Sequence, residues 1–246
     1  MTDPVLDGLR RELHVAPAPY SLADRASGLV LVDLVNGFCT VGAGNLAPVE
    51  PDEQIAGMVE ASNRLAHEFA EAKRPILAFL DTHEPGKPEP PYPPHCERGT
   101  GEENLVPELA WLESCPEATL IRKDCINGFV GAIEAVHDGR HGVHHNKVVD
   151  WINTHRLETV VVTGICSDIC VMDFVLTLLS ARNHGMTPSL RDVVVHEPAT
   201  ATYHLPRAVV ESQGLHASFA HPQPHTHHVA LYFMASRGAI LASELN

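Results

Sequence analysis

Short runs of consecutive apolar residues, many of them β-branched, recur along the chain and alternate with segments of another periodicity. The runs cover residues 28–33, 75–81, 118–123, 158–164 and 191–196. Consecutive apolar positions are typical of parallel strands that are buried on both faces. Apolar residues at helical spacing follow the first run and, from about Cys170, the fourth run. The alternation predicts βαβ units and hence a mostly parallel sheet with helices on both faces.

The two ends of the chain follow this pattern less clearly. Residues 1–27 contain prolines and charges of both signs without a sustained period, so we expect an N-terminal arm on a single domain of residues 28–246. A sixth strand is expected at 214–220, and residues 227–244 have the composition of a closing helix. A proline-rich loop follows the second run, from residue 84 to about 107.

Composition excludes several classes of partner. Lys and Arg number 17 against 31 Asp and Glu, a net charge of -14 without a dense basic cluster, so nucleic acid is not an expected partner. No apolar run approaches the about 20 residues of a membrane helix, and no apolar N-terminal stretch directs export. We therefore expect a cytoplasmic protein whose six cysteines are free thiols.

Chemically reactive side chains stand where the predicted strands end. In open parallel sheets, binding sites lie beyond the carboxyl ends of the strands. The residues at those ends are Asp33, Asp81 with His83, Lys123, and the turn "GICSDIC" with Cys166 and Cys170. Each residue alone is explained equally well as a cap, a surface charge or a packing residue. Their joint position at the strand ends favours one shared site.

The two cysteines of the turn are predicted to differ in role. Their spacing is unusual for a zinc clip, and the chain has no second cysteine pair. Cys170 begins the predicted helix, where free N–H groups and the helix dipole favour a thiolate, and Lys123 adds positive charge. Asp33 can accept the thiol proton and later return it to a leaving group. Cys166 is then a bystander in a turn whose backbone N–H groups can face an oxyanion.

A second cluster lies at the start of the proline-rich loop. Asp81 and His83 are two positions apart on an extended segment, so their side chains project to the same side. With His95, they offer a carboxylate and two imidazoles, a set that suits zinc, iron or manganese. A histidine-bearing surface loop is the alternative. The consecutive prolines of "PPYPPHC" argue against it, because they hold the loop in one shape.

Two other histidine groups are assigned no function. His137, His141, His144 and His145 lack a fixed carboxylate or cysteine, and we expect a loop there. His225, His227 and His228 are expected to flank the start of a helix.

As a set, five stretches resemble the nicotinamidases of the isochorismatase-like hydrolases, most closely the plant type. They are "LVLVDLVNGFCTVG", "FLDTHEPGKPEPPYPPHCERGT", "IRKDCINGFVG", "VVTGICSDICVMDF" and "AHPQ", in this order between about residues 28 and 240. The resemblance implies a three-layer αβα sandwich with a mostly parallel sheet of roughly six strands. It also implies hydrolysis of nicotinamide to nicotinate and ammonia through a cysteine thioester, in NAD salvage.

The resemblance further implies a role for each matching residue. The triad positions are Asp33, Lys123 and Cys170; the metal positions are Asp81, His83, His95 and Glu89; the aromatic walls of the pyridine site are Phe38 and Tyr92. Tyr92 stands where the family more often has Trp. The metal is one divalent ion, expected to be zinc, with iron or manganese as alternatives. A cis peptide at Ile165–Cys166, which costs about 3–4 kcal/mol, would aim the amides of Cys166 and Cys170 at an oxyanion.

Other functions remain open beside this one. A protein of the same fold could hydrolyse another small amide or an isochorismate-like ether, although the isochorismate branch lacks the cysteine found at Cys170. A noncatalytic metal-binding scaffold is the alternative from a different class, and it would tolerate loss of any member of the triad. We expect a homo-oligomer that binds nicotinamide.

Overall fold

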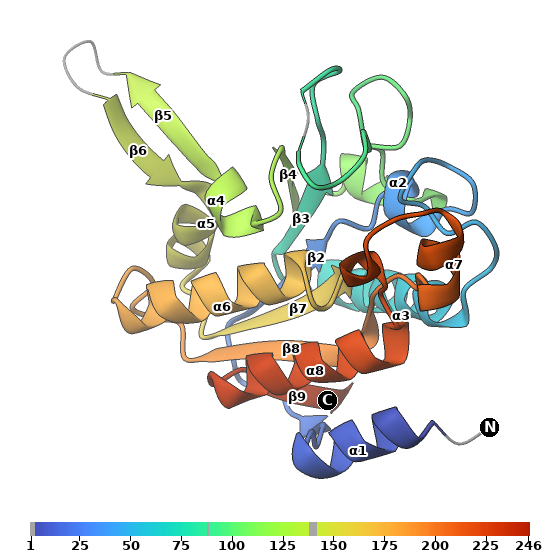
Figure 1. The fold of residues 1–246 in the computed structure, drawn as a ribbon. Helices are drawn as coiled ribbons and strands as arrows, with labels where there is room; N and C mark the ends of the chain where they lie inside the picture. Colours follow the sequence, from blue (N-terminus) through green and yellow to red (C-terminus); the bar gives the residue numbers. More distant parts are fainter. Residues whose placement is uncertain (1–2, 88, 138–141) are drawn as a thin grey trace.

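Seven parallel strands form the central sheet, in the order β1-β9-β8-β7-β2-β3-β4 (Figure 1). The computed structural model describes residues 3–87, 89–137 and 142–246. The strands are β1 (Ala18–Tyr20), β2 (Ser27–Val32), β3 (Ile76–Asp81), β4 (Ala118–Lys123), β7 (Thr159–Ile165), β8 (Asp192–Ala201) and β9 (Ile240–Leu245). Every residue of β2, β3 and β7 is buried. The five strands predicted from consecutive apolar residues are therefore confirmed.

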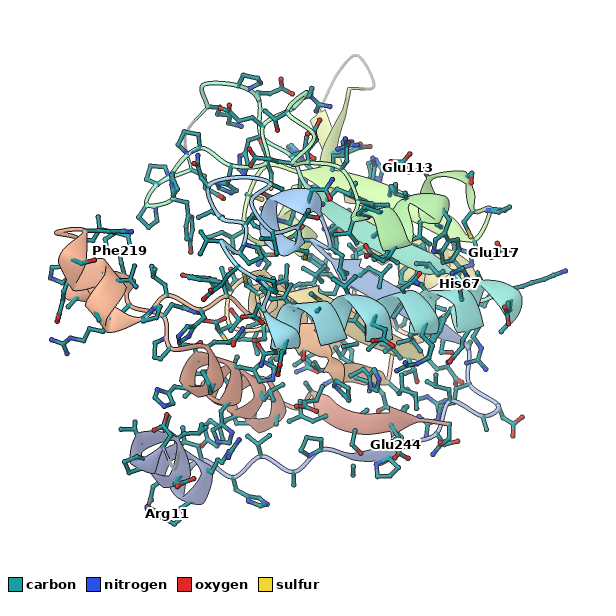
Figure 2. The ribbon with its side chains drawn as sticks, turned by 90° about the vertical axis from the view of Figure 1, so that its right-hand side faces the viewer. Arg11, His67, Glu113, Glu117, Phe219 and Glu244 are labelled. Carbon is teal, nitrogen blue, oxygen red and sulfur yellow. The ribbon has the colours of Figure 1, made fainter. Side chains whose placement is uncertain are left out.

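Alternate residues of the central strands point into two separate cores. Val30 and Val32 pack with α5 (Lys147–His155), α6 (Cys170–Asn183) and α8 (Gln223–Ser236). Leu29 and Leu31 pack on the other side with α3 (Glu53–Glu71) and the 3-10 helix η1 (Pro107–Ser114). Figure 2 shows α3 lying across its face of the sheet. This arrangement is the expected αβα sandwich, because strand side chains alternate between faces with a period of two.

The C-terminal part of the chain differs from the prediction in two places. Residues 214–220 form no strand: the short helix α7 (Arg207–Ser212) precedes them, and they contain the 3-10 turn η2 (Ala217–Phe219). The expected closing helix ends early, since α8 stops at Ser236 and β9 follows. Gly238 at φ 99 explains the end of the helix, because this left-handed conformation favours glycine and commonly terminates helices.

The N-terminal arm contributes to both the sheet and a helical layer. Helix α1 (Pro4–Glu12) lies beside α8 (Figure 1), and β1 adds an edge strand by pairing with β9. His225 and His228, in the first turns of α8, contact Asp3 Oδ2 and the carbonyl oxygen of Leu13, each at 2.8 Å. Two of the three residues of β1 are exposed, which explains why no apolar pattern predicted it.

The histidine-rich segment is a hairpin rather than the expected loop. Strands β5 (Ile133–His137) and β6 (Gly142–Asn146) form a separate antiparallel pair that projects from the body (Figure 1). His145 contacts Asp150 Oδ2 at 2.6 Å, and His144 is exposed. His141 and the side chain of His137 lie outside the described residues. In the described part of the chain, the two strands pair only with each other and not with the main sheet.

The short helices α2 (Asn36–Cys39) and α4 (Gly128–Gly131) follow β2 and β4 directly and complete the architecture. None of the helices described is both long and apolar enough to span a bilayer.

Candidate active site

Four neighbouring strands bring the predicted reactive residues to one edge of the sheet. Asp33 follows β2, and Asp81 and Lys123 end the paired strands β3 and β4 at the same register position. The Lys123 Nζ atom lies 2.9 Å from Asp33 Oδ2 and 2.8 Å from Asp81 Oδ1. All three side chains are buried. Lys123 is thus a buried cation shared by two carboxylates from adjacent strands.

The protonation of this cluster is governed by burial and by the shared cation. Burial raises the pKa of Asp33 to about 6, against the opposing effect of Lys123. For Asp81, burial acts in the same direction, but Lys123 and the two histidines His83 and His95 hold its pKa well below the usual range. Burial alone would lower the pKa of Lys123, yet the neighbouring carboxylates raise it well above normal. Asp33 is therefore the group that can exchange a proton near neutral pH.

Cys170 is the first residue of α6 and adjoins Asp33. It is only 8% exposed, and its thiol acts to lower the pKa of Asp33 against the effect of burial. Burial raises the pKa of Cys170 itself well above its ordinary value, although Lys123 acts to lower it. The expectation that the helix start favours a resting thiolate is therefore wrong, because desolvation outweighs the nearby positive charge. A thiol of this kind needs an adjacent base, and Asp33 occupies that position.

Residues 164–170, which we call the 164–170 turn, bring Cys166 and Cys170 over the end of β2. At Gly164, φ is 123, and a Cβ there would lie 2.1 Å from the carbonyl oxygen of Val32. The expected cis peptide at Ile165–Cys166 is not observed: among the described residues the one cis bond is Pro90–Pro91. The chain changes direction instead through Gly164 and through Ile169, whose φ and ψ are -123 and -95.

The backbone amides of Cys166 and Cys170 remain available in this turn. The carbonyl oxygen of Cys166 accepts hydrogen bonds from the amides of Ile169 and Val171, each at 3.1 Å, which closes the turn. Within the described part of the chain, the amides of Cys166 and Cys170 donate to no backbone carbonyl. Two free donors beside a thiol are suited to a developing negative charge on an oxygen.

Asp81, His83 and His95 form a compact group of metal-ligand atoms. One ligand atom from each lies within 4.8 Å of the others. Among the described residues, no other set of three or more His, Cys, Asp or Glu side chains meets this distance. Asp81 Oδ2 is 3.1 Å from His83 Nε2 and 3.2 Å from His95 Nε2. All three side chains are buried. The group is a candidate site for a divalent metal ion.

Glu89 lies beside this group of three residues. Its Oε2 lies 3.6 Å from Nε2 of both His83 and His95, while its Oε1 accepts a hydrogen bond from the amide of Ile126 at 3.0 Å. His95 Nδ1 faces the carbonyl oxygen of Pro93 at 2.8 Å. A proton on Nδ1 leaves Nε2 unprotonated, as a metal ligand requires, so the donor set fits a divalent ion.

The two predicted aromatic walls lie beside the same histidine. The ring centres of Phe38 and Tyr92 are 5.7 and 6.0 Å from that of His95. Burial raises the pKa of Tyr92 to about 12, with further contributions from the thiols of Cys166 and Cys170. Tyr92 is therefore close to His95 and within electrostatic range of both cysteines.

Several residues near the site were not predicted. Asp168, inside the 164–170 turn, accepts a hydrogen bond from Thr202 at 2.6 Å and contacts His221 at 2.6 Å. Tyr203 stacks on His221, with ring centres 3.8 Å apart. Burial raises the pKa of Tyr203, and so do the nearby Cys166 and Tyr92. His221 belongs to the "AHPQ" stretch, which was the sequence signal for this group.

Next to the turn lies a Ser–His–Glu row that starts at a buried serine. Ser167 Oγ is 2.9 Å from His227 Nδ1, and His227 Nε2 is 3.9 Å from Glu197. Ser167 is completely buried. His227 and Glu197 line a surface groove of about 390 Å³ on the side of α3. The contact of Ser167 with His227 joins the turn to helix α8.

The strand order and the chemistry at the strand ends define a class, the hydrolases of the isochorismatase type. The chain belongs to this family, because the model of the Isochorismatase domain matches residues 27–230. It is 50% identical over 244 residues to Nicotinamidase 1 of Arabidopsis thaliana, covering 98% of this chain and 96% of that protein. It is 29% identical over 172 residues to Nicotinamidase of Escherichia coli (strain K12), covering 61% of this chain and 75% of the relative.

Solved structures share the fold. The nicotinamidase of Bacillus subtilis superimposes with a TM-score of 0.64 at 21% identity, covering 88% of this chain and 99% of that chain. The pyrazinamidase of Pyrococcus horikoshii, solved in complex with zinc, has a TM-score of 0.57 at 20% identity, covering 88% and 98%. These similarities agree with the observed αβα architecture.

Proposed function

We propose that this protein hydrolyses nicotinamide to nicotinate and ammonia and so serves NAD salvage. The observation that carries the proposal is the position of Lys123, which contacts both Asp33 beside Cys170 and Asp81 of the candidate metal group. A thiol with its base and a ligand group for a metal are thereby parts of one site. The 50% identity to a plant nicotinamidase supports the same substrate.

We propose zinc as the ion, with Asp81, His83, His95 and Glu89 as its ligands. Two imidazoles with two carboxylates suit a borderline metal such as zinc, and the related archaeal pyrazinamidase was solved with zinc. When bound, the ion supplies an electrophilic contact for the ring nitrogen of the substrate. Phe38 and Tyr92 would flank the ring and orient its carboxamide toward Cys170.

Each covalent step then uses side chains already in place. Asp33 accepts the thiol proton while the sulfur of Cys170 attacks the carboxamide carbon. The amides of Cys166 and Cys170 stabilise the negative charge on the oxygen, and Lys123 stabilises the charges on Asp33 and sulfur. Asp33 then donates its proton to the departing nitrogen as the C–N bond breaks. Ammonia leaves, and the acyl group remains on Cys170 as a thioester. In the second half, Asp33 takes a proton from the water whose oxygen attacks the thioester carbon. The C–S bond then breaks, Asp33 returns the proton to the sulfur, and the acid departs and loses its own proton to solvent as nicotinate.

The direct test is ammonia release from nicotinamide by the purified protein at defined metal content. Release that depends on the metal and saturates with nicotinamide supports the proposal. A protein that retains the metal, binds no nicotinamide and releases no ammonia would instead be the noncatalytic scaffold.

The raised pKa of Asp33 predicts the acid limb of the pH profile. Asp33 must be ionised to accept the thiol proton, and its pKa is about 6 instead of 3.8. The ionised fraction increases as the pH rises through that value, so kcat/KM should increase about tenfold per pH unit below about pH 6 and then level off. Initial rates between pH 4.5 and 8 on metal-loaded protein measure this. A limb centred near 4 would show that burial does not control Asp33.

Loss of single ligands should lower the metal content. We expect His83→Ala, His95→Ala and Glu89→Ala to weaken metal binding beyond the about 10–100-fold caused by outer-shell changes, because each removes a direct ligand. Metal content after dialysis and the KM for nicotinamide should change together. The control is His145→Ala, an equivalent change on the β5–β6 hairpin. Full metal occupancy in His83→Ala would place the ion elsewhere.

A further inference from the structure

Asp168 stands between Cys166 and Cys170, yet its carboxylate points away from helix α6. An aspartate just before a helix commonly caps it by accepting a hydrogen bond from a backbone amide of the first turn. Here the N-cap residue is Ile169, and no side chain caps the helix. Asp168 instead directs Oδ1 to the hydroxyl of Thr202 and Oδ2 to His221 Nε2, both at 2.6 Å. Both partners come from the segment after β8.

His221 connects this carboxylate to the base of the segment between β8 and α8. Residues 203–221 leave the sheet edge and return to it, and their two ends are joined by a bridge between Leu205 and His221, with N···O distances of 2.9 and 2.7 Å. Nδ1 of His221 is 2.8 Å from the carbonyl oxygen of Tyr203. The Tyr203 ring stacks on the imidazole at an interplanar angle of 11°. His221 is only 8% exposed.

The ring nitrogens of His221 both face acceptor oxygens. One acceptor is a carbonyl and the other is a carboxylate, so both contacts are hydrogen bonds only when both nitrogens carry protons. His221 and Thr202 lower the pKa of Asp168 against the effect of burial, so an ionised carboxylate accepts both contacts. Charge-assisted hydrogen bonds of this kind are shorter and stronger than neutral ones. The pair is therefore a firm link between two parts of the chain that are 53 residues apart.

We propose that Asp168 and His221 are a positioning pair for the reaction: their contact fixes the 164–170 turn to the base of the 203–221 segment and so aims the amides of Cys166 and Cys170 at the substrate oxygen. Neither side chain touches the reacting atoms in this role. The inference rests on the hydrolysis proposed above, since the amides have this task only if an oxyanion forms. It assigns a function to the "DIC" and "AHPQ" stretches that the triad and the metal ligands leave unexplained.

The geometry explains why a small loss of order here should affect the reaction. The two amides have no backbone partner in the described residues, so their direction depends on what holds the turn. Removing one oxyanion donor costs about 10²–10³-fold in kcat, and misplacement by about 1 Å can cost about 10²-fold. If the turn moves but keeps both donors, the kcat of the protein should thus fall by about 10–100-fold. Substrate binding, through the ring, should change little.

The test uses the full-length, metal-loaded protein and the variants Asp168→Asn and His221→Gln, singly and together. The matched control is His225→Gln, which breaks a similar histidine–carboxylate contact, to Asp3 at 2.8 Å, on the α1–α8 surface. Hydrogen–deuterium exchange of the peptide spanning residues 164–172 reports the order of the turn and requires no substrate. Steady-state kinetics on nicotinamide give kcat and KM separately.

We expect exchange in the turn peptide to accelerate about tenfold in both single variants, with kcat lower by about 10–100-fold and KM within about twofold. The kcat of the double variant should be no lower than that of the less active single variant, because the two residues act as one unit. The control should match the wild type. Unchanged exchange and kcat in Asp168→Asn would overturn the proposal. Faster exchange throughout the chain with a lower melting temperature would also overturn it, because the pair would then serve folding.

Failure of the proposed function has a different signature. If the wild-type protein releases no ammonia from nicotinamide, the hydrolase proposal fails. The exchange of the turn peptide in the variants still decides whether Asp168 and His221 hold the turn.

Discussion

Cys170→Ala should lower the turnover of nicotinamide by on the order of 10⁴-fold or more, whereas Cys166→Ala should retain much of it. Cys170 adjoins Asp33 and Lys123, so its thiol is placed to pass its proton to Asp33. Cys166 is expected to contribute its backbone amide, which alanine retains. Burial raises the pKa of both thiols, and nearby Asp168 raises that of Cys166 further, so the difference between them is the base Asp33 that adjoins Cys170.

Ammonia release at saturating nicotinamide measures both variants, and mass spectrometry of acid-quenched protein identifies the cysteine that carries the acyl group. Thermal melting serves as the control for folding, since both side chains are small. If Cys166→Ala were inactive and Cys170→Ala active, the nucleophile would be Cys166 and the prediction would be wrong. If both variants lost activity and the wild-type protein carried the acyl group only on Cys170, the side chain of Cys166 would be needed to shape the oxyanion site.

Benzamide should be hydrolysed at least about 10⁴-fold less efficiently than nicotinamide, whereas pyrazinamide should remain a substrate. Benzamide has the shape of nicotinamide but no ring nitrogen to approach the group formed by Asp81, His83, His95 and Glu89. A site built to engage a polar atom discriminates strongly against a ligand that lacks it, because its own polar groups are left unpaired. Pyrazinamide retains a nitrogen at the matching place.

The three amides are compared by kcat/KM at equal protein and metal concentration. Removing the metal by chelation and restoring it tests whether the ligand group is responsible. Similar efficiency on benzamide would show that the ring nitrogen is not recognised and would leave a general small-amide hydrolase with Cys170 chemistry. Selectivity that persists after complete metal removal would assign recognition of the nitrogen to side chains such as Tyr92.

The strand ends were predictable from sequence because their geometry is a property of the fold class. Once consecutive apolar residues indicate parallel strands, residues such as Asp33 and Lys123 must meet at one edge. Glu89 was different, because it lies in a loop where spacing does not determine distance. Only the family resemblance pointed to it, and the structure places its carboxylate 3.6 Å from both histidines.

The features that were missed depend on long-range contacts or on weak local signals. Asp168 and His221 meet across 53 residues, and no pattern within either segment indicates the contact. Strand β9 contains Ser243 and Glu244, so it resembles a continuation of α8 unless Gly238 is taken as a helix end. The expected thiolate at Cys170 was wrong because its position at the helix start could be read from sequence, whereas its burial could not.

The pairing of β1 with β9 has a practical consequence for handling this protein. Residues 18–20 alone keep the C-terminal strand from being the edge of the main sheet, and the amide of Asn246 also donates to the carbonyl oxygen of Tyr20. Deleting residues 1–20 would spare every residue of the active site but leave one side of β9 without backbone partners. An exposed strand edge is a template for intermolecular pairing. Shortened versions would therefore precipitate or self-associate during expression, so fusion tags are better added to the intact arm than substituted for it.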